Sequence, residues 1–405
     1  MTVKQIYELM NTVTGEVLGK TELVAEDLSN VVDVGTELFN ASEVDNYVKS
    51  LVNHIGKVVF VNRPYSGKIP SVLMDSWEFG SVLEKISCDT PEATENESWD
   101  LVDKQEYKQD IFYKPTVSAK FFNSKVTFEV PMSFTEKQVK ESFSNAAQLN
   151  GFISMIYNAV DRSMTIKIDS LVMRTINSMI AQTLNADKAK FTGGYGTAST
   201  ARCVNLLKLY NDKFFPATSG TGGSTPNPDA LTADKAIYDP DFIRFASYTM
   251  GVYIDRLASI STLFNVGGKD RFTDANNLHV IMLSDFAKGA DVYLQSDVRH
   301  NELTRLPNYE TIPYWQGSGK NYEFDSTSAI NVKIDADTTV DIDGIVGVMF
   351  DRDALGVSNL DRRVTTAYNA KAEFFNNYYK FDAGYFNDTN ENFVVFFVSD
   401  AKTAG

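Results

Sequence analysis

The sequence predicts an α+β fold built around one long helix and a strand-rich C-terminal part. Apolar residues recur at helical spacing over residues 139–184, and no proline occurs between residues 132 and 215. Over residues 368–398, 11 of 31 residues are aromatic, compared with 12% in the whole chain. Aromatic residues favour strands and large buried contacts, so we expect these strands to pack against the long helix.

Short elements are expected in the first 62 residues. Residues 3–9 and 42–55 carry apolar side chains at helical spacing. Residues 57–62 are β-branched and aromatic and are followed by Arg63-Pro64, which predicts a strand that ends there.

Residues 63–116 are punctuated by prolines and glycine, so no long regular element fits them. Their middle part, residues 92–110, holds seven carboxylates and two lysines, a net charge of 2 − 7 = −5. Apolar residues directly precede this acidic part. Two interpretations stay open: a solvated surface excursion, or a long two-stranded arm whose apolar residues are buried only against another subunit.

The long helix is introduced by two local signals. Residues 126–130 alternate between apolar and polar side chains and predict a strand that Pro131 ends. Ser133-x-x-Glu136 has the pattern of a capping box and predicts the start of the helix. Fifty helical residues would span about 75 Å, so a break near residues 161–165, where β-branched side chains begin, is an alternative. A coiled coil is disfavoured because heptad spacing is not sustained.

From residue 191 the pattern changes to an α/β unit with glycine-rich joints. Residues 216–229 predict an exposed loop, and Asp239-Pro240 predicts the capped start of a helix that reaches residue 264. Residues 279–284 predict a strand, residues 285–294 a helix, and residues 344–350 and 364–398 further strands.

Composition argues against most enzyme classes. The chain has 405 residues with 53 acidic and 38 basic side chains, a net charge of −15, and only three histidines and two cysteines. Two cysteines form neither a disulfide framework nor a four-ligand zinc site, and an acidic surface is poorly suited to wrapping DNA. No secretory signal or membrane-length apolar run is visible, which predicts a soluble protein made in a bacterial-type cytoplasm.

Known catalytic motifs are absent from the sequence. The glycine-rich stretches 193–196 and 267–269 lack the context of a phosphate-binding loop and predict turns. The carboxylates Asp335, Asp337, Asp341 and Asp343 fit an EF-hand loop poorly and are better explained by a polar alternating strand. His54, His279 and His300 are scattered, and Cys88 and Cys203 lack catalytic neighbours. We therefore predict no catalytic, cofactor-binding or metal-binding residue, no cofactor, and no enzymatic activity.

Four stretches resemble the major head proteins of small short-tailed phages of Gram-positive hosts. They are residues 69–80 with Glu84-Lys-Ile86, residues 314–319, residues 350–356 and residues 370–386. Together with the order of elements, they resemble tailed-bacteriophage major capsid (major head) proteins with the Hong Kong 97-like fold.

This resemblance implies a single discontinuous fold with an N-terminal arm, an extended β-loop, a spine helix with a peripheral sheet, and an inserted α/β axial domain. It assigns residues 1–56 to the arm, 57–117 to the extended loop, 118–190 to the first strand and spine helix of the peripheral domain, 191–343 to the axial domain and 344–405 to returning peripheral strands.

The resemblance also implies a subunit that self-assembles, as hexamers and pentamers, into an icosahedral head shell in the host bacterial cytoplasm. Such a shell would enclose double-stranded DNA without sequence-specific binding or membrane contact, with scaffolding and portal proteins as partners. Val72, Leu73, Trp77 and Phe79 are the candidate contacts with a neighbouring subunit. An encapsulin-like nanocompartment protein is the first alternative, and a metal-dependent enzyme that uses the Asp335–Asp343 cluster is the second.

Overall fold

The computed structural model describes residues 3–18, 25, 50, 69–74, 83–107, 110–135, 137–138, 141, 146–220, 223–225, 227–295, 309–315 and 329–400. Helices and strands both contribute, as the α+β class requires. The chain divides into two compact units of discontinuous segments. Unit 1 comprises residues 1–78, 125–172 and 357–384, and unit 2 comprises residues 79–124, 173–356 and 385–405. None of the described helices combines the length and apolar character needed to cross a bilayer.

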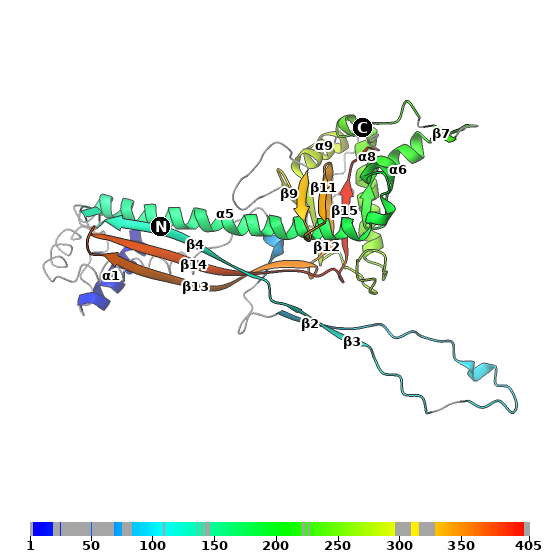
Figure 1. Cartoon of the computed structure of the whole chain (residues 1–405), viewed down its shortest axis with the longest axis horizontal. Coiled ribbons are helices and arrows are strands. Elements are labelled where there is room, and N and C mark those ends of the chain that lie inside the picture. Colours follow the sequence, from blue (N-terminus) through cyan, green and yellow to red (C-terminus); the bar gives the residue numbers. More distant parts are fainter. Residues whose placement is uncertain are drawn as a thin grey trace. The chain divides into compact units, whose positions relative to one another are not determined.

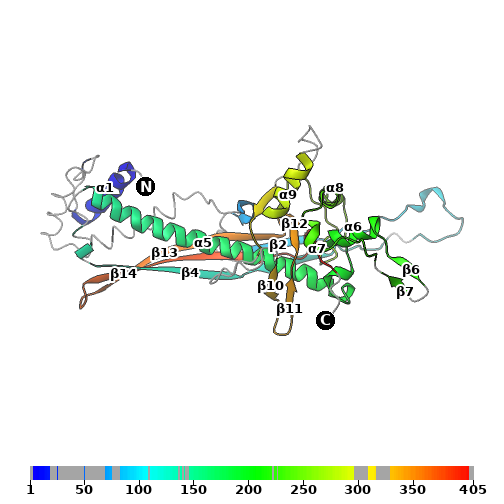
Figure 2. The same ribbon diagram turned by 90° about the horizontal axis from the view of Figure 1, so that it is seen from above.

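Unit 1 contains a four-stranded sheet in the order β1-β13-β14-β4. Its strands are β1 (Leu73–Met74), β4 (Lys125–Thr135), β13 (Leu355–Asn369) and β14 (Phe374–Asn387). Alternate residues of β14 are buried, including Phe375, Tyr379 and Phe381, because one face of the strand packs on a core. Figures 1 and 2 show β4, β13 and β14 running lengthwise along the first part of helix α5 (Ala146–Ala186).

Helix α5 has 41 residues and spans about 60 Å at 1.5 Å per residue. Its buried side chains include Leu149, Ile153, Ile156, Val160, Met164 and Ile168, a stripe with helical spacing. The alternative of a break near residues 161–165 is wrong, because the helix runs through this region. Thr165 Oγ1 donates a hydrogen bond of 2.8 Å to the Asp161 carbonyl, which satisfies its hydroxyl inside the helix.

The strand before α5 is longer than predicted. β4 continues through Pro131 to Thr135, and Pro131 pairs with Tyr378 of β14. Proline is tolerated here because β4 is an edge strand. In such a strand, the backbone N–H of every second residue has no partner in the sheet. The predicted capping residue Ser133 therefore lies in a strand, and its Oγ donates to Asn376 Oδ1 at 2.6 Å.

A reciprocal pair of cap-like hydrogen bonds lies two residues after Ser133, whereas the long helix α5 begins only at Ala146 and not at the predicted capping box. The Thr135 backbone N–H donates to Gln138 Oε1 at 3.0 Å, and the Gln138 N–H donates to Thr135 Oγ1 at 3.2 Å. This is the capping-box geometry with glutamine in place of glutamate. The sequence contained both patterns, and pairing of Ser133 within the sheet decides between them.

Unit 2 contains a five-stranded mixed sheet in the order β5-β15-β12-β8-β9. Its strands are β5 (Cys203–Asn205), β8 (Leu278–Leu283), β9 (Tyr309–Ile312), β12 (Ile345–Asp351) and β15 (Phe393–Phe397). All five residues of β15 are buried, since this strand lies inside the sheet and both of its faces are covered. The strands predicted at residues 279–284 and 344–350 are confirmed as β8 and β12.

The C-terminal part does not return to a single sheet. β13 and β14 pair with β4, whereas β12 and β15 pair with β8 and β5. Residues 344–405, which the resemblance assigns to returning peripheral strands, therefore contribute strands to both sheets. The continuous apolar runs of β12 and β15 suit a sheet that is covered on both faces. The alternating pattern of β14 suits a sheet that is covered on one face.

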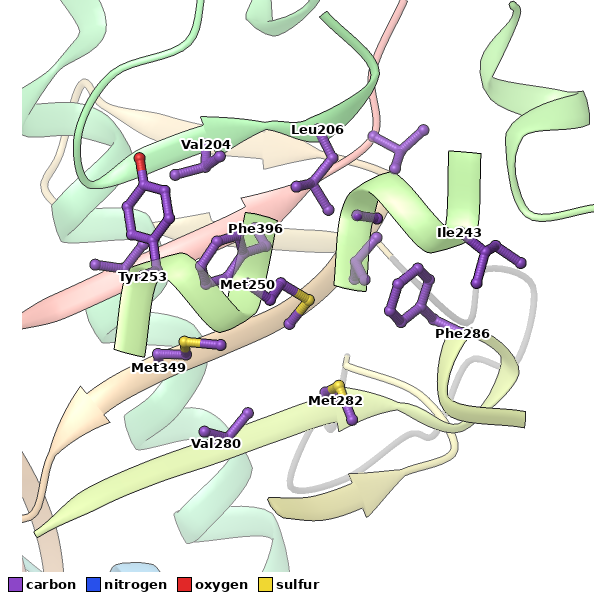
Figure 3. Packing of buried hydrophobic residues seen from close by; sticks show 14 of the residues in the cluster. Val204, Leu206, Ile243, Met250, Tyr253, Val280, Met282, Phe286, Met349 and Phe396 are labelled. Carbon is purple, nitrogen blue, oxygen red and sulfur yellow. The ribbon is translucent and has the colours of Figure 1, made fainter. Parts of the chain in front are cut away.

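Helices α6 (Leu206–Phe214), α8 (Pro240–Leu257) and α9 (Ser284–Gln295) belong to the same unit. Figure 3 shows Met250 and Tyr253 of α8 against Phe396 of β15 and Met349 of β12. The Tyr253 and Phe396 rings have centroids 5.3 Å apart at an interplanar angle of 84°, an edge-to-face contact. This cluster is the apolar core of the unit.

Helix α8 starts where it was predicted and ends earlier. Asp239 Oδ1 accepts a hydrogen bond of 2.8 Å from the Phe242 N–H, and Pro240 occupies the first helical position. The helix ends at Leu257 instead of residue 264. The Thr273 N–H donates a hydrogen bond of 2.7 Å to the Leu257 carbonyl, and the chain continues as a loop.

The remaining elements are short or stand apart from the two sheets. Helix α1 (Val3–Leu18) confirms the first predicted helix, whereas the elements predicted at residues 42–55 and 57–62 lie outside the described residues, apart from residue 50. The predicted loop at residues 216–229 contains a small hairpin. The other elements are η1 (Pro70–Val72), β2 (Leu83–Cys88), η2 (Glu97–Trp99), β3 (Val117–Phe122), η3 (Lys188–Lys190), η4 (Tyr195–Thr197), β6 (Thr218–Gly220), β7 (Gly223–Thr225), α7 (Ala233–Ala236), β10 (Ile330–Lys333) and β11 (Thr339–Ile342).

Candidate functional site

Strands β2 and β3 form a two-stranded antiparallel ribbon in unit 2, from Leu83 paired with Phe122 to Cys88 paired with Val117. Figure 1 shows the chain continuing beyond these strands as a long open loop of residues 89–116. Of the two interpretations of this region, the two-stranded arm describes its geometry. We call β2 and β3 the ribbon and residues 89–116 the loop.

The ribbon has an outward apolar face. Ile86, Val117 and Phe121 are 68%, 59% and 62% exposed, and they alternate with residues that are less exposed. The register places Glu84 opposite Phe121, Ile86 opposite Ala119 and Cys88 opposite Val117. This face therefore carries a single charged residue, Glu84, which is unusual for a surface in contact with water.

The loop continues the same character. Trp99 is 94% exposed, and Phe112 and Tyr113 are 86% and 81% exposed, in a segment that also carries most of the acidic cluster. Exposed aromatic side chains at this density are typical of surfaces that bind another protein. The other strongly exposed apolar residues of the loop are Leu101, Val102 and Ile111.

The inward face of the ribbon is polar and ionic. Lys85 lies directly opposite Lys120, and Ser87 lies opposite Ser118, with 3.0 Å between the two hydroxyl oxygens. The Lys85 ammonium is 2.9 Å from Asp388 Oδ2, and the Lys120 ammonium is 2.9 Å from Asp388 Oδ1. The usual arrangement of a strand pair, apolar inside and polar outside, is thus reversed over most of the ribbon.

Electrostatics around Asp388 favour its ionised form. Burial by itself would raise the pKa of this carboxyl, but the hydrogen bonds from Lys85 and Lys120 outweigh burial and hold the pKa below its ordinary value. Burial of Lys85 acts to lower its pKa, and the Asp388 and Glu391 carboxylates reverse this effect and raise it. Both groups are therefore charged at neutral pH.

The carboxylate cluster predicted to be structural has the geometry of a hairpin. Asp335 Oδ1 accepts hydrogen bonds from the Asp337 and Thr338 N–H groups at 3.0 and 2.8 Å, which closes the turn between β10 and β11. These bonds hold the pKa of Asp335 below its ordinary value. Residues of β11 alternate between exposed and buried, so the prediction of an alternating strand is confirmed. Within the described ranges, no group of three or more His, Cys, Asp or Glu side chains is placed to hold a metal ion.

The histidines and cysteines occupy unrelated places. His54 and His300 lie outside the described residues, and burial followed by the charge of Arg352 lowers the pKa of His279. Cys88 is exposed on the outward face of the ribbon. Cys203 is buried in the sheet, which raises the pKa of its thiol.

Glycines were predicted to form turns at two places. Gly193, Gly194 and Gly268 all have positive φ values, of 107°, 103° and 63°. The turn interpretation of these stretches is confirmed, because such φ values favour glycine.

Comparison with known proteins identifies the family. The model of the family described as Phi29-like phage major capsid protein matches residues 10–220 and 232–397, which include the ribbon, the loop and both sheets. The chain belongs to this family. It is therefore a shell-forming capsid protein of a phage virion, and the resemblance to phage major head proteins is confirmed. No curated protein sequence matches the chain.

Solved phage structures share similarity with this capsid protein at low sequence identity. A chain in the capsid structure of Staphylococcus phage Andhra is 9% identical with a TM-score of 0.46, covering 83% of this chain and 86% of that one. A chain in a structure of the head fiber and inner core protein of bacteriophage P68 is 7% identical with a TM-score of 0.47, covering 82% and 84%. One from Mycobacterium phage Ogopogo is 12% identical with a TM-score of 0.41, covering 83% and 94%.

The four predicted contact residues of the capsid protein have different surroundings. Val72 is 2% exposed, so its side chain is already covered within its own subunit, and Leu73 is half-buried in β1 opposite Val357. Val72 and Leu73 thus have partners within their own subunit, because β1 joins the sheet of unit 1. Trp77 and Phe79 lie outside the described residues. Contact of these residues with a neighbouring subunit stays a prediction.

The most exposed apolar residues of the ribbon were not predicted from the sequence. Ile86, Val117 and Phe121 were not among the candidates, because the alternation of residues 83–88 is one of burial and not of apolar and polar residue types. One motif of the resemblance proves structural: Trp315 is fully buried, and its Nε1 donates to the Ile345 carbonyl at 2.9 Å.

Proposed function

We propose that this capsid protein assembles, as hexamers and pentamers, into an icosahedral head shell that encloses the double-stranded DNA of the phage. Each subunit would use the outward face of the ribbon, together with the loop, to bind a neighbouring copy. The observation that carries this proposal is the reversed ribbon: Ile86, Val117 and Phe121 face away from their own subunit, whereas Lys85 and Lys120 face toward it. Covering the apolar face by a second copy would remove it from water.

The Hong Kong 97-like organisation is part of this proposal. Residues 1–56 would be the N-terminal arm, and the extended loop, assigned to residues 57–117, would have its projecting part in residues 83–122. Residues 118–190 and the returning strands β13 and β14 would form the peripheral domain. Residues 191–343 would form the axial domain, to which β12 and β15 contribute through their pairing with β8 and β5.

Charge supports the partner classes in this proposal. A net charge of −15 suits a container wall, because packaged DNA is also negative and would not adhere to it. DNA would be enclosed without sequence-specific binding, and scaffolding and portal proteins would complete the assembly. The role is structural and includes no catalysis, in keeping with a family of shell proteins.

A double substitution on the outward face tests the proposal. Ile86→Ser with Phe121→Ser removes two large exposed apolar side chains, and Ser87→Ala with Ser118→Ala is the matched control on the opposite face of the same strands. Electron microscopy and sedimentation velocity of protein co-expressed with its scaffolding partner give the readout. We expect shells from the wild type and the control, and unassembled subunits with an unchanged thermal transition from the Ile86/Phe121 variant.

Two outcomes would contradict the proposal. Shells from the Ile86/Phe121 variant at wild-type yield would show that the outward face is not an assembly contact. Loss of its thermal stability would show that these side chains support the subunit's own fold.

A further inference from the structure

The ribbon has a charge conflict within its own ladder. Lys85 and Lys120 are directly opposite each other and their side chains share the inward face. Like charges at directly opposite positions of an antiparallel pair destabilise the pair. The ribbon therefore requires a counter-charge at this rung, and no acidic residue of β2 or β3 lies on that face.

Asp388 is the carboxylate that contacts both lysines. Asp388 lies in the turn between β14 and β15, and its side chain is 3% exposed. Its two oxygens are divided between the two lysines, Oδ2 to Lys85 and Oδ1 to Lys120, each at 2.9 Å. We call these three residues the lysine clip.

The surrounding groups fix the carboxylate in place. The Asp388 N–H donates to the Ala354 carbonyl at 2.7 Å, and the Asn390 N–H donates to Asp388 Oδ1 at 3.1 Å. Lys85 also donates to the Asp353 carbonyl at 2.9 Å, and its ammonium is 3.2 Å from Glu391. The carboxylate is therefore held in the turn that leads into β15, while its partners belong to the ribbon.

Apolar attachment of the ribbon is limited to one rung. The Phe122 and Phe386 rings have centroids 5.1 Å apart at the base of the ribbon. On the inward face, the next pair along the ribbon is Lys85 with Lys120. The pair after it is Ser87 with Ser118, whose two hydroxyl groups hydrogen-bond to each other. At the far end Lys269 Nζ is 2.5 Å from Asp89 Oδ1, in a pair that is about one-third exposed. Apolar packing thus holds the base of the ribbon, and ion pairs set the direction in which the ribbon extends.

We propose that Asp388 is a positioning residue for assembly, which sets the direction of the ribbon relative to the five-stranded sheet by holding Lys85 and Lys120 together. Neutralising Asp388 removes the carboxylate that the two facing ammonium groups share and leaves Lys85 with its contact to Glu391, so we expect the ribbon to turn about the Phe122–Phe386 contact. The outward apolar face is then presented at a different angle. The effect of this changed angle on shell assembly rests on the proposed function of the ribbon, whereas the positioning of the ribbon by Asp388 does not.

Distance measurement between two spin labels tests this directly on unassembled subunits. Cys88 on the outward face is a native labelling site, Cys203 is buried and unreactive, and Tyr248→Cys places the second label on α8, where the native side chain is 68% exposed. We expect one narrow distance population in the parent protein. Asp388→Asn should lose this population and give several broader or shifted ones.

Matched variants separate positioning from general stability. Asp382→Asn removes a carboxylate of unit 1 that pairs with Arg363 at 2.8 Å, and it should leave the distance unchanged. Asp388→Glu keeps the charge and should restore a single population. Where Asp388→Asn fails to fold, Lys120→Gln leaves the Lys85–Asp388 pair intact and should still broaden the distribution.

An unchanged narrow population in both Asp388→Asn and Lys120→Gln overturns the proposal. This outcome is distinct from failure of the proposed function of the ribbon, which appears as a wild-type yield of shells from the Ile86/Phe121 variant. Shell assembly by Asp388→Asn with a displaced ribbon would confirm the positioning and place the assembly contact elsewhere.

Discussion

The five-stranded sheet and the ribbon belong to the same unit, but the sheet buries its apolar side chains and the ribbon exposes most of them. In the sheet, Phe393, Phe396 and Phe397 of β15 are at most 1% exposed, because helices of the same chain cover them. In the ribbon, Ile86 and Phe121 are more than 60% exposed, and the two lysines, Lys85 and Lys120, occupy the inward face. The difference indicates that the sheet buries apolar side chains within its own subunit, whereas the ribbon displays an apolar surface, which we propose is covered by a second chain.

The largest expected effect lies in the sheet. Phe396→Ala removes a fully buried ring that contacts Tyr253, and it should lower the free energy of unfolding by about 3–5 kcal/mol. The equivalent truncation in the ribbon, Phe121→Ala, should change it by less than about 0.5 kcal/mol. Urea unfolding of unassembled subunits measures both. Similar losses for the two variants would break the comparison.

The second effect concerns a buried ion pair of the same unit. Arg202 Nη2 lies 2.7 Å from Asp187 Oδ1, and the two side chains are 18% and 4% exposed. Burial acts to raise the pKa of Asp187, but hydrogen bonds from Thr200 and Arg202 hold it below its ordinary value. Its contribution to stability is therefore present above the unfolded pKa of about 3.9 and is lost as pH falls through the lower folded value.

Arg202→Met leaves the Asp187 carboxylate buried without its cation and should cost about 2–4 kcal/mol near neutral pH. The deficit should shrink toward about pH 4, because a protonated Asp187 no longer needs a counter-charge. Lys208→Met is the control, since its partner Asp212 is 58% exposed and such pairs contribute about 0.5 kcal/mol or less. A deficit that grows on acidification would contradict the assigned role of Arg202.

A smaller effect is expected at Gly344, before β12. Its φ is +74°, and a Cβ atom would lie 2.0 Å from the Val398 carbonyl oxygen. Gly344→Ala should therefore destabilise unit 2 by about 1–3 kcal/mol. Gly151→Ala in α5 is the matched control: a Cβ there meets nothing within 4 Å, so helix propensity predicts a gain of up to about 1 kcal/mol. Thermal unfolding of both variants gives the comparison, and a neutral Gly344→Ala would refute the close approach.

The smallest effect on the subunit is expected from the loop. Replacing residues 92–114 by a short glycine-serine linker should leave the thermal transition unchanged, because the described side chains of this segment are mostly exposed. Assembly should be lost. Assembly at wild-type yield after this deletion would show that the exposed aromatic residues of the loop serve another purpose.

The sequence predicted those features that depend on local pattern. The long apolar stripe before Leu184 and the alternation around Phe128 predicted α5 and β4. A helix or strand that buries one face has apolar residues at a regular spacing, and this spacing is visible in the sequence. Pro131 was misread as a strand end, since its tolerance depends on the edge position of β4, which is a property of the sheet and not of the segment.

Long-range contacts could not be read in the same way. Lys120 and Asp388 are 268 residues apart, and nothing local distinguishes this aspartate from other acidic residues in the chain. The division of β12, β15, β13 and β14 between two sheets likewise depends on which partners reach them during folding. Aromatic density predicted strands in this region and could not predict their pairing.

Accessibility of Cys88 tests most directly whether a second copy covers the outward face of the ribbon. The thiol is exposed in the free subunit and lies beside Val117 on that face, while Cys203 is buried and serves as the unreactive internal reference. Maleimide labelling should be fast in unassembled subunits and slowed at least about tenfold in assembled shells, since a covering neighbour removes the thiol from solvent. Equal labelling rates in subunits and shells would contradict the account.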